Sequence, residues 1–269
     1  MTQMSEVKVA WVVELEVFPS DWMRTFATAI ASQGHRILCW EDEWRGPAGG
    51  PIPTMPFVFL GSLGNAAWVR ENMPWMPGAY CDVEAFRCTN YYPRAERWLL
   101  CGSRWRALPA QQFINEAIDQ HLMHFFVRPD SPLKPFSGRL LTRDEVSWEA
   151  IDYGFYYDNR DLVVVVSEPR SITAEWRYVV VDRRVVAGSA YAAQGRAALP
   201  DSPEGAPWRY AQEVASSLAP PEDVYVLDVC EADGHLYLLE LNPFSGADLY
   251  ACDPEAVVRA VSAVASRGF

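Results

Sequence analysis

Two carboxylates and one amide lie in or beside two strongly apolar runs near the end of the chain, VYVLDV and LYLLEL. They are Asp228, Glu240 and Asn242. Carboxylate and amide oxygens on rigid strands suit Mg²⁺, which prefers few carboxylates together with phosphate oxygens. The residue types therefore indicate a magnesium site. The alternative is a polar sheet face that is turned to solvent.

The spacing of these residues predicts how they meet. An Asp-Gly pair at 233–234 predicts a tight turn between two antiparallel strands. Because side chains alternate along a strand, Glu240 and Asn242 should share one face, with Leu239 and Leu241 on the other. Asp228, on the partner strand, should come within a few residues of Glu240. Two carboxylates this close repel each other unless a cation separates them.

A second group of candidate residues is cationic and surrounds one loop, in FFVRPDSPLKPFSGRLLT (125–142). An apolar strand delivers Arg128, a proline-rich loop holds Lys134, and Arg139 lies near the next strand. Lysine is rare in this chain, with 2 lysines against 21 arginines, so Lys134 stands out. Cations at a strand end can cover phosphates. The alternative is a solvated hairpin loop.

Two further strands carry candidate residues. In EWRYVVVDRRVVAG (175–188), Glu175 and Arg177 alternate onto one face, which predicts the wall of a cleft or, alternatively, an exposed ion pair. The run LVVVVSEP (162–169) predicts a buried strand whose exit, at Glu168 and Pro169, can present backbone groups to an adenine edge. The alternative for that run is an ordinary core strand.

These candidates all lie in the second part of the chain, where strands dominate and isolated helices interrupt them. We expect strands at 123–129, 138–142, 162–169, 175–191, 224–231 and 235–242, with helices at 109–120, 208–219 and from Pro254 to Gly268. The first part predicts a small α/β unit, with strands at 8–17, 35–40 and 56–61, a helix from Ser20 to Gly34, and another at 93–100. The fold class is therefore α+β, with a boundary near 103–112.

Composition narrows the class of protein. The 269 residues carry a net charge of −12, which argues against a general nucleic-acid binder. No apolar run is long enough for a transmembrane helix, and the N-terminus predicts a strand rather than a signal peptide. The six cysteines lack CxxC spacing, so we expect reduced, buried thiols and a cytoplasmic protein. The sequence offers no third metal ligand beside His121 and His124, so we expect structural roles for both.

In chain order, these pieces resemble the ATP-grasp fold. VRPDSPLKPFSGRLL resembles the strand and phosphate-covering loop of that family, with Arg128 where a lysine is usual. VVVVSEP resembles its adenine hinge, EWRYVVVDRRVVA its acid-x-Arg strand, and VLDV…LYLLELNPFSG its Asp…Glu-x-Asn magnesium motif. Two arginines with one loop lysine resemble the two-arginine, one-lysine branch. The resemblance implies a pre-ATP-grasp domain at 1–110 and an ATP-grasp domain at 111–269.

The resemblance also implies roles for individual residues. Asp228, Glu240 and Asn242 would hold Mg²⁺. Arg128 and Lys134 would contact ATP phosphates, Arg177 the γ-phosphate or an acylphosphate, and Glu168, Pro169 and Glu175 would line the nucleotide site, with Arg177 and Lys134 as the catalytic pair.

The implied activity is a Mg²⁺- and ATP-dependent ligase that joins a small-molecule or peptide carboxylate to an amine, or less often a thiol. Two alternatives stay open at this point. One is a non-catalytic nucleotide- or peptide-binding module, and the other is a phosphotransferase. The substrate pocket should lie between the two domains, lined partly by residues 75–105, but the sequence does not name the substrate or the oligomeric state.

Overall fold

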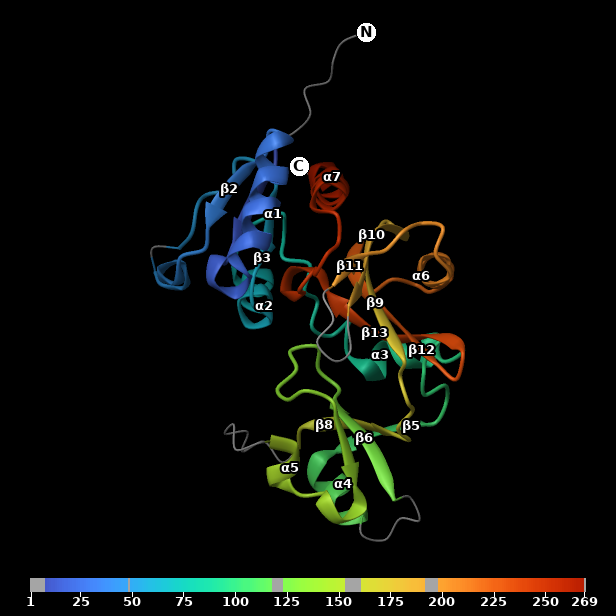
Figure 1. The fold of residues 1–269 in the computed structure, drawn as a ribbon. Helices are drawn as coiled ribbons and strands as arrows, with labels where there is room; N and C mark the ends of the chain where they lie inside the picture. The colour runs from blue at the N-terminus through green and yellow to red at the C-terminus, as the bar shows by residue number, and fades with distance from the viewer. Residues whose placement is uncertain (1–7, 48, 118–122, 153–160, 192–197, 269) are drawn as a thin grey trace.

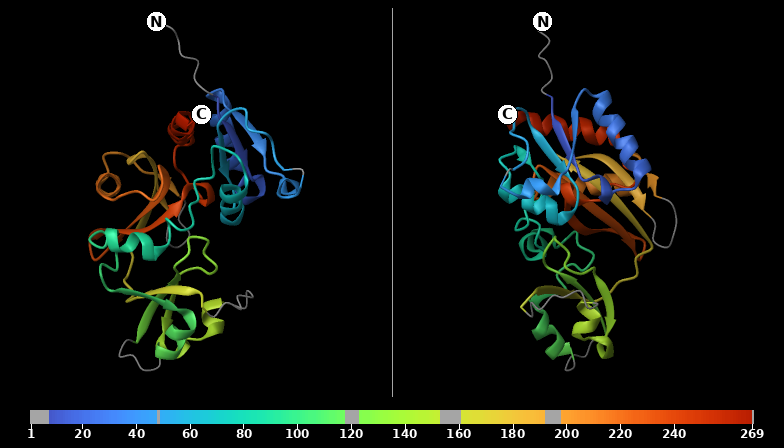
Figure 2. Two further views of the ribbon diagram at one scale, coloured as in Figure 1. Left: turned by 180° about the vertical axis from the view of Figure 1, so that it is seen from behind. Right: turned by 90° about the vertical axis from the view of Figure 1, so that its left-hand side faces the viewer.

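The chain forms three sheets, and Figures 1 and 2 show the N-terminal sheet beside a five-stranded sheet, with a small four-stranded sheet below them. We describe it from a computed structural model that covers residues 8–47, 49–117, 123–152, 161–191 and 198–268. The N-terminal sheet lies at the upper left of Figure 1, the five-stranded sheet to its right and the small sheet at the bottom. Within these residues, no helix has the length and apolar character needed to cross a lipid bilayer.

The N-terminal unit is a parallel sheet in the order β2-β1-β3-β4. Its elements are β1 (Ala10–Val13), α1 (Ser20–Ser32), β2 (Arg36–Cys39), β3 (Phe57–Leu60), α2 (Leu63–Asn72) and β4 (Pro77–Gly78). β1 and β3 are buried along their whole length, as expected for parallel strands covered on both faces. The predicted α/β unit is therefore observed. The predicted strand at 8–17 was too long, because a 3₁₀ turn at Leu15–Val17 follows β1.

The small sheet has antiparallel strands in the order β5-β8-β6-β7. Its elements are β5 (Trp105–Pro109), α4 (Ala110–Ala117), β6 (His124–Pro129), β7 (Arg139–Thr142), α5 (Trp148–Asp152) and β8 (Val163–Ser167). β5 had not been predicted as a strand. Its pairing with β8 places residues 105–109 in this sheet, on the N-terminal side of the expected division at 110.

The middle sheet has antiparallel strands in the order β11-β10-β9-β12-β13. Its elements are β9 (Ala174–Val181), β10 (Arg184–Tyr191), β11 (Leu199–Pro200), α6 (Ala206–Ser217), β12 (Val224–Ala232), β13 (His235–Pro243) and α7 (Pro254–Ala265). Both hairpin turns place consecutive residues at positive φ, 48° and 65° at Asp182-Arg183 and 54° and 74° at Asp233-Gly234. Such turns match the twist of the strands they join. The hairpin predicted at 233–234 therefore forms, and a second turn divides the predicted strand at 175–191 into β9 and β10.

A helix predicted at 93–100 is wrong in its position. The helix α3 spans Cys88–Ala95, and the following residues leave it to run beside β13. Leu238 donates its N–H to the Trp98 carbonyl over 2.7 Å, and Leu100 donates to the Leu238 carbonyl over 3.0 Å. These sheet-like bonds satisfy the backbone that a longer helix would otherwise have paired internally.

The first and last parts of the chain share one core. Helix α7 packs on α1, and Trp11 donates its indole N–H to Ser262 over 3.1 Å. Val58 of β3 and Val179 of β9 belong to the same buried cluster. Asp253 caps α7, accepting the N–H of Glu255. This packing fixes the N-terminal unit against the five-stranded sheet.

Candidate functional site

The hairpin of β12 and β13 brings the three predicted metal-site residues together. Asp228 pairs with Glu240 in the register of the two strands. The Asn242 amide nitrogen donates to Asp228 Oδ2 over 3.1 Å and to Glu240 Oε1 over 2.9 Å. Asp228 and Asn242 are buried. The two carboxylates and the amide therefore face one point in the interior, and the solvent-facing alternative is wrong.

A β-bulge changes the face on which one neighbour lies. Asp228 pairs with Glu240, but Val229 pairs with Leu238, so β13 has one extra residue, Leu239. A bulge of this kind redirects the side chains beside it. Leu239 consequently lines the same cavity as Glu240, contrary to the expected alternation. No feature of the sequence marks this bulge.

Arg177 approaches the carboxylates from the neighbouring strand β9, where it pairs with Asp228 in register. Its Nε and Nη2 donate to the two oxygens of Asp228 over 2.8 and 2.7 Å, and its Nη1 donates to the Asp248 carbonyl over 2.9 Å. The guanidinium also lies over the rings of Tyr191 and Tyr250, 5.5 and 5.0 Å from their centroids. A bidentate, aromatic-covered arginine keeps one fixed orientation.

Glu240 is held by the two other predicted cations. Arg128, at the end of β6, lies 2.7 Å from Glu240 Oε2, and Lys134, in the β6–β7 loop, lies 3.0 Å from Oε1. Lys134 has a φ of 49°, a left-handed conformation that is uncommon outside glycine. Such backbone strain clusters at ligand clamps. The loop therefore places its lysine at the carboxylate, and the solvated-loop alternative is wrong.

The two carboxyl groups have opposite pKa shifts. Burial raises the pKa of Glu240, but the charges of Arg128 and Lys134 outweigh it and hold that pKa well below its usual range. Asp228 is completely buried, and its desolvation raises its pKa although Arg177 opposes the shift. Glu240 is therefore firmly anionic, and the cluster has three cations for two carboxylates.

The remaining predicted residues lie around this cluster, with one exception. Glu175 accepts the hydroxyl of Tyr191 over 2.7 Å and lines the charged part of the cleft. Glu168 and Pro169 line the apolar part, and Glu168 lies 3.5 Å from Arg104. Arg139, one of the three cations noted around the loop, instead donates to the Ala150 carbonyl over 2.7 Å. His124 is exposed at the start of β6, and His121 lies outside the described residues.

The cleft between the small and middle sheets contains two adjoining cavities. One is about 490 Å³ and mostly apolar, and reaches from Arg128 to the exit of β8. The other is about 300 Å³ and contains Lys134, Glu175 and Glu240. Phe126, Arg128, Ile172 and Leu239 line both. One continuous site therefore has an apolar end and a charged end, which suits a nucleotide.

The donor set at the charged end fits Mg²⁺ bound together with phosphate. Among the described residues, no group of three or more His, Cys, Asp or Glu side chains could hold a metal ion. Asp228 and Glu240, with the Asn242 amide, give two carboxylates and one amide, fewer ligands than the six that Mg²⁺ requires. Phosphate oxygens and water would complete the shell, and the Asn242 amide would turn its oxygen inward.

The comparisons with known proteins agree with this geometry. A family model described as an ATP-grasp domain, family 2 of the two-arginine, one-lysine clade, matches residues 106–260, more than half of the chain. The chain belongs to this ATP-grasp family. The resemblance that the sequence motifs carried, including the branch with two arginines and one lysine, is therefore confirmed. No curated protein matches the chain.

Solved ATP-grasp structures share the fold at low sequence identity. A RimK domain ATP-grasp protein from Sphaerobacter thermophilus matches with a TM-score of 0.61 and 13% identity, covering 94% of this chain and 99% of that one. The D-cycloserine synthetase DcsG matches with a TM-score of 0.59, 13% identity, and coverage of 96% and 99%. N5-carboxyaminoimidazole synthetase from Staphylococcus aureus, solved with ADP, matches with a TM-score of 0.55 and 12% identity, covering 96% of this chain and 78% of that one. The predicted α+β ATP-grasp fold is therefore confirmed.

Proposed function

We propose that this ATP-grasp protein is a Mg²⁺- and ATP-dependent ligase that joins a carboxylate to an amine or, less often, a thiol. One observation carries the proposal. A single cleft runs from an apolar cavity to a buried cluster of three cations and two carboxylates. The apolar end suits a nucleotide base, and the charged end suits a triphosphate.

The roles of the residues follow from where their charges lie. Arg128 and Lys134 would bind the phosphates, and Arg177 would meet the γ-phosphate. Glu168 and Pro169 would flank the base, and Glu175 would lie beside the phosphates. Because arginine stays protonated, Arg128 supplies at every working pH the charge that a lysine usually supplies at this position in the family.

Nucleotide binding would exchange the partners within this cluster. The cations that now neutralise Glu240 and Asp228 would turn to phosphate oxygens, and Asp228, Glu240 and Asn242 would hold Mg²⁺. When bound, Mg²⁺ would neutralise negative charge on the phosphates and orient them. The buried carboxylates are never left without a positive partner, which avoids the large cost of an unpaired buried charge.

In the proposed reaction, no side chain of the protein forms a covalent bond to the substrate. An oxygen of the substrate carboxylate attacks the γ-phosphorus, and the bond to the bridging oxygen breaks, releasing ADP and an acylphosphate. The amine nitrogen then attacks the acyl carbon, phosphate leaves, and the nitrogen loses a proton. Lys134 and Arg177 would stabilise the negative charge on the transferred phosphoryl group, and the walls of the cleft would exclude water.

The solved relatives support ligation at the family level. They include a synthetase, DcsG, and the ligase PsnB, solved with a precursor peptide and an ATP analogue. We propose a small-molecule or peptide carboxylate as the substrate. We also propose that the chain divides into a domain at residues 1–110 and an ATP-grasp domain at 111–269, and that the protein is cytoplasmic. The six cysteines, all without disulfides, support the location.

Turnover assays separate this proposal from its two rivals. The protein is incubated with ATP, Mg²⁺ and a panel of carboxylates, with and without amines, and ADP release is measured. Release that requires both a carboxylate and an amine supports the ligase. A phosphorylated product formed without an amine supports the phosphotransferase, and ATP binding with no ADP release across the panel supports the binding module.

A further inference from the structure

The apolar cavity is closed at one end by residues that precede the family match. The match begins at residue 106, yet Leu99, Leu100 and Cys101 line this cavity together with the exit of β8. None of these three residues lines the adjoining charged cavity, which contains Lys134 and Glu240. A base bound in the apolar cavity would therefore meet these three residues on the side away from its phosphates.

The backbone of this segment is fastened to the five-stranded sheet. Leu99 forms a parallel bridge with Leu238, and the two flanking hydrogen bonds are 2.7 and 3.0 Å long. The bridge lies directly beside Leu239, the bulged residue that enters the cleft. β13 thus supplies Leu239 to the cavity and also holds the segment at Leu99 that lines it.

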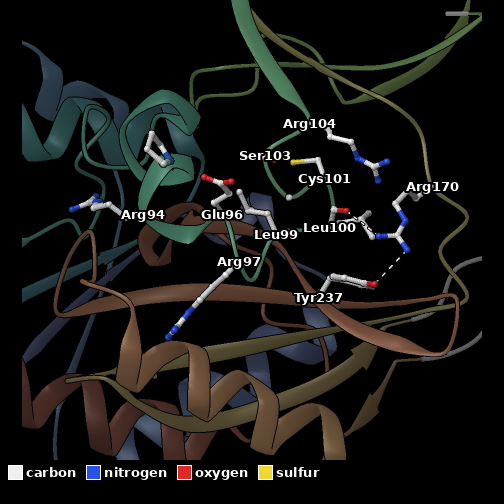
Figure 3. A pocket seen from close by; sticks show the side chains of 12 residues that line it. Arg94, Glu96, Arg97, Leu99, Leu100, Cys101, Ser103, Arg104, Arg170 and Tyr237 are labelled. Carbon is white, nitrogen blue, oxygen red and sulfur yellow. Dashed lines mark hydrogen bonds between the residues drawn. The ribbon is translucent and has the colours of Figure 1, made fainter.

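Arg170 ties this segment to the exit of β8. Its Nη1 donates to the Leu100 carbonyl over 3.2 Å, and its Nη2 donates to Asp233 over 2.5 Å and to the Tyr237 hydroxyl over 3.4 Å. Its guanidinium also lies 4.6 Å from the centre of the Tyr237 ring (Figure 3). Four contacts to three residues, on two segments of the chain, hold this arginine in one place.

A third cavity, of about 650 Å³, lies on the other side of residues 99–101 (Figure 3). It shares Leu99, Leu100, Cys101 and Arg170 with the apolar cavity. Figure 3 shows Arg94 and Arg97 pointing away from Arg104 and Arg170, so the arginines around it do not converge on one anion. Leu99, Leu100 and Cys101 therefore lie between this cavity and the apolar cavity.

We propose that Leu99–Cys101, fastened by Arg170, form the end wall of the nucleotide-base site and limit the size of the base that it accepts. This inference rests on the proposed ATP-dependent function. The ligand chemistry is a flat, uncharged heterocycle, because the surrounding side chains include Phe126, Val165 and Leu239. The wall would act on the base alone and leave the phosphate end unchanged.

Cys101 reports on this contact directly. It is half-buried, Cys39 is exposed, and the other four cysteines are buried. Burial raises the pKa of Cys101 to about 11, so alkylation with iodoacetamide at pH 9 is slow enough to time by mass spectrometry. We expect saturating Mg²⁺-ATP to slow alkylation of Cys101 at least about tenfold and to leave Cys39 unchanged. Mg²⁺-tripolyphosphate, which lacks a base, should not protect Cys101.

The outcomes separate this inference from the proposed function. ATP that raises the melting temperature without protecting Cys101 would overturn the end wall and leave the ligase proposal standing. Equal protection by tripolyphosphate would also overturn it, since closure of the cleft rather than the base would then cover the thiol. If ATP does not bind at all, the proposed function fails and the inference fails with it.

A size-increasing variant gives a second test with a matched control. Cys101→Trp should raise the Kd for Mg²⁺-ATP at least about tenfold and change that for Mg²⁺-tripolyphosphate less than about twofold. Cys39→Trp, at an exposed position on β2, should change neither. An unchanged ATP affinity in folded Cys101→Trp would remove the segment from the base site.

Discussion

The two ends of the cleft are built in different ways. At the charged end, Arg128, Lys134, Arg177, Asp228 and Glu240 neutralise one another through side-chain contacts of 3.0 Å or less. At the apolar end, side chains such as Leu140 and Val165 fill space, and Arg170 supplies the strong polar contacts. A change at the charged end leaves a buried charge without its partner, whereas a change at the apolar end alters only shape and area. We therefore expect large effects at one end and graded effects at the other.

The largest effect should follow from Glu240→Gln. The substitution removes the charge that pairs with buried Arg128 and with Lys134. We expect kcat/KM to fall at least about 100-fold, since the metal loses a ligand charge. The free energy of unfolding should fall by about 3 kcal/mol, because Arg128 is left without a buried partner. Kinetics and urea unfolding measure the two effects.

The control for this variant is Glu213→Gln, at an exposed position on α6. It should change neither turnover nor stability. Normal turnover by folded Glu240→Gln would show that Glu240 does not hold the metal. An unchanged stability would show that the ion pairs at this end do not depend on one another.

A buried carboxylate outside the cleft sharpens the comparison. Glu222 has one arginine, Arg70, at 3.2 Å, where Glu240 has two cations. Burial raises the pKa of Glu222 to about 7, although the N–H of Asp82 and Arg70 oppose the shift. The folded state therefore keeps a proton that the unfolded chain releases, and the free energy of unfolding should fall as pH rises from about 4.5 to about 7.

We expect this loss to be about 2 kcal/mol, measured by urea unfolding at pH 5, 6, 7 and 8. Glu222→Gln should flatten that part of the profile, because it removes the titrating group. Glu71→Gln, at an exposed position on α2, should keep the profile of the unmodified protein. A profile that stays unchanged in Glu222→Gln would assign the pH dependence to another group.

A smaller effect is expected from Lys134→Ala. Lys134 is about one-third exposed, so solvent already screens its contact with Glu240. The Kd for Mg²⁺-ATP should rise about tenfold, or about 1.4 kcal/mol, while the melting temperature shifts by less than about 2 °C. The control is Lys8→Ala. Lys8 is the only other lysine in the sequence, and its position is exposed. An unchanged Kd in Lys134→Ala would exclude Lys134 from the phosphate site.

The smallest effect should come from the apolar end. Leu239→Ala removes part of a half-buried wall, so the Kd for ATP should rise about threefold, by isothermal titration calorimetry. Leu199→Ala, where the side chain is 63% exposed, should leave the Kd unchanged. A loss in Leu239→Ala as large as that in Glu240→Gln would break the contrast between the two ends.

The sequence was most informative where strand periodicity and turn chemistry agree. The Asp-Gly turn at 233–234 and the spacing of Asp228, Glu240 and Asn242 were enough to predict one hairpin with three polar groups together. The roles of these residues in metal binding stay predictions. The segment before the family match was least informative, because its contacts are with strands more than one hundred residues away. Its helix was placed too late. The strand β5, most of which lies inside the match, was also not predicted.

By itself, the sequence determined the α+β class, the order of the strands and the residue types in the cleft, because these depend on local periodicity and on side-chain chemistry. Only the tertiary structure decided that Leu239 turns into the cleft, that Leu99–Cys101 line its apolar cavity, and that each carboxylate already has a cationic partner. A bulge, a single strand bridge and a buried ion pair each depend on two segments meeting in space. The stabilising contacts in each join residues that are far apart in the sequence, so no local stretch of the sequence reveals them.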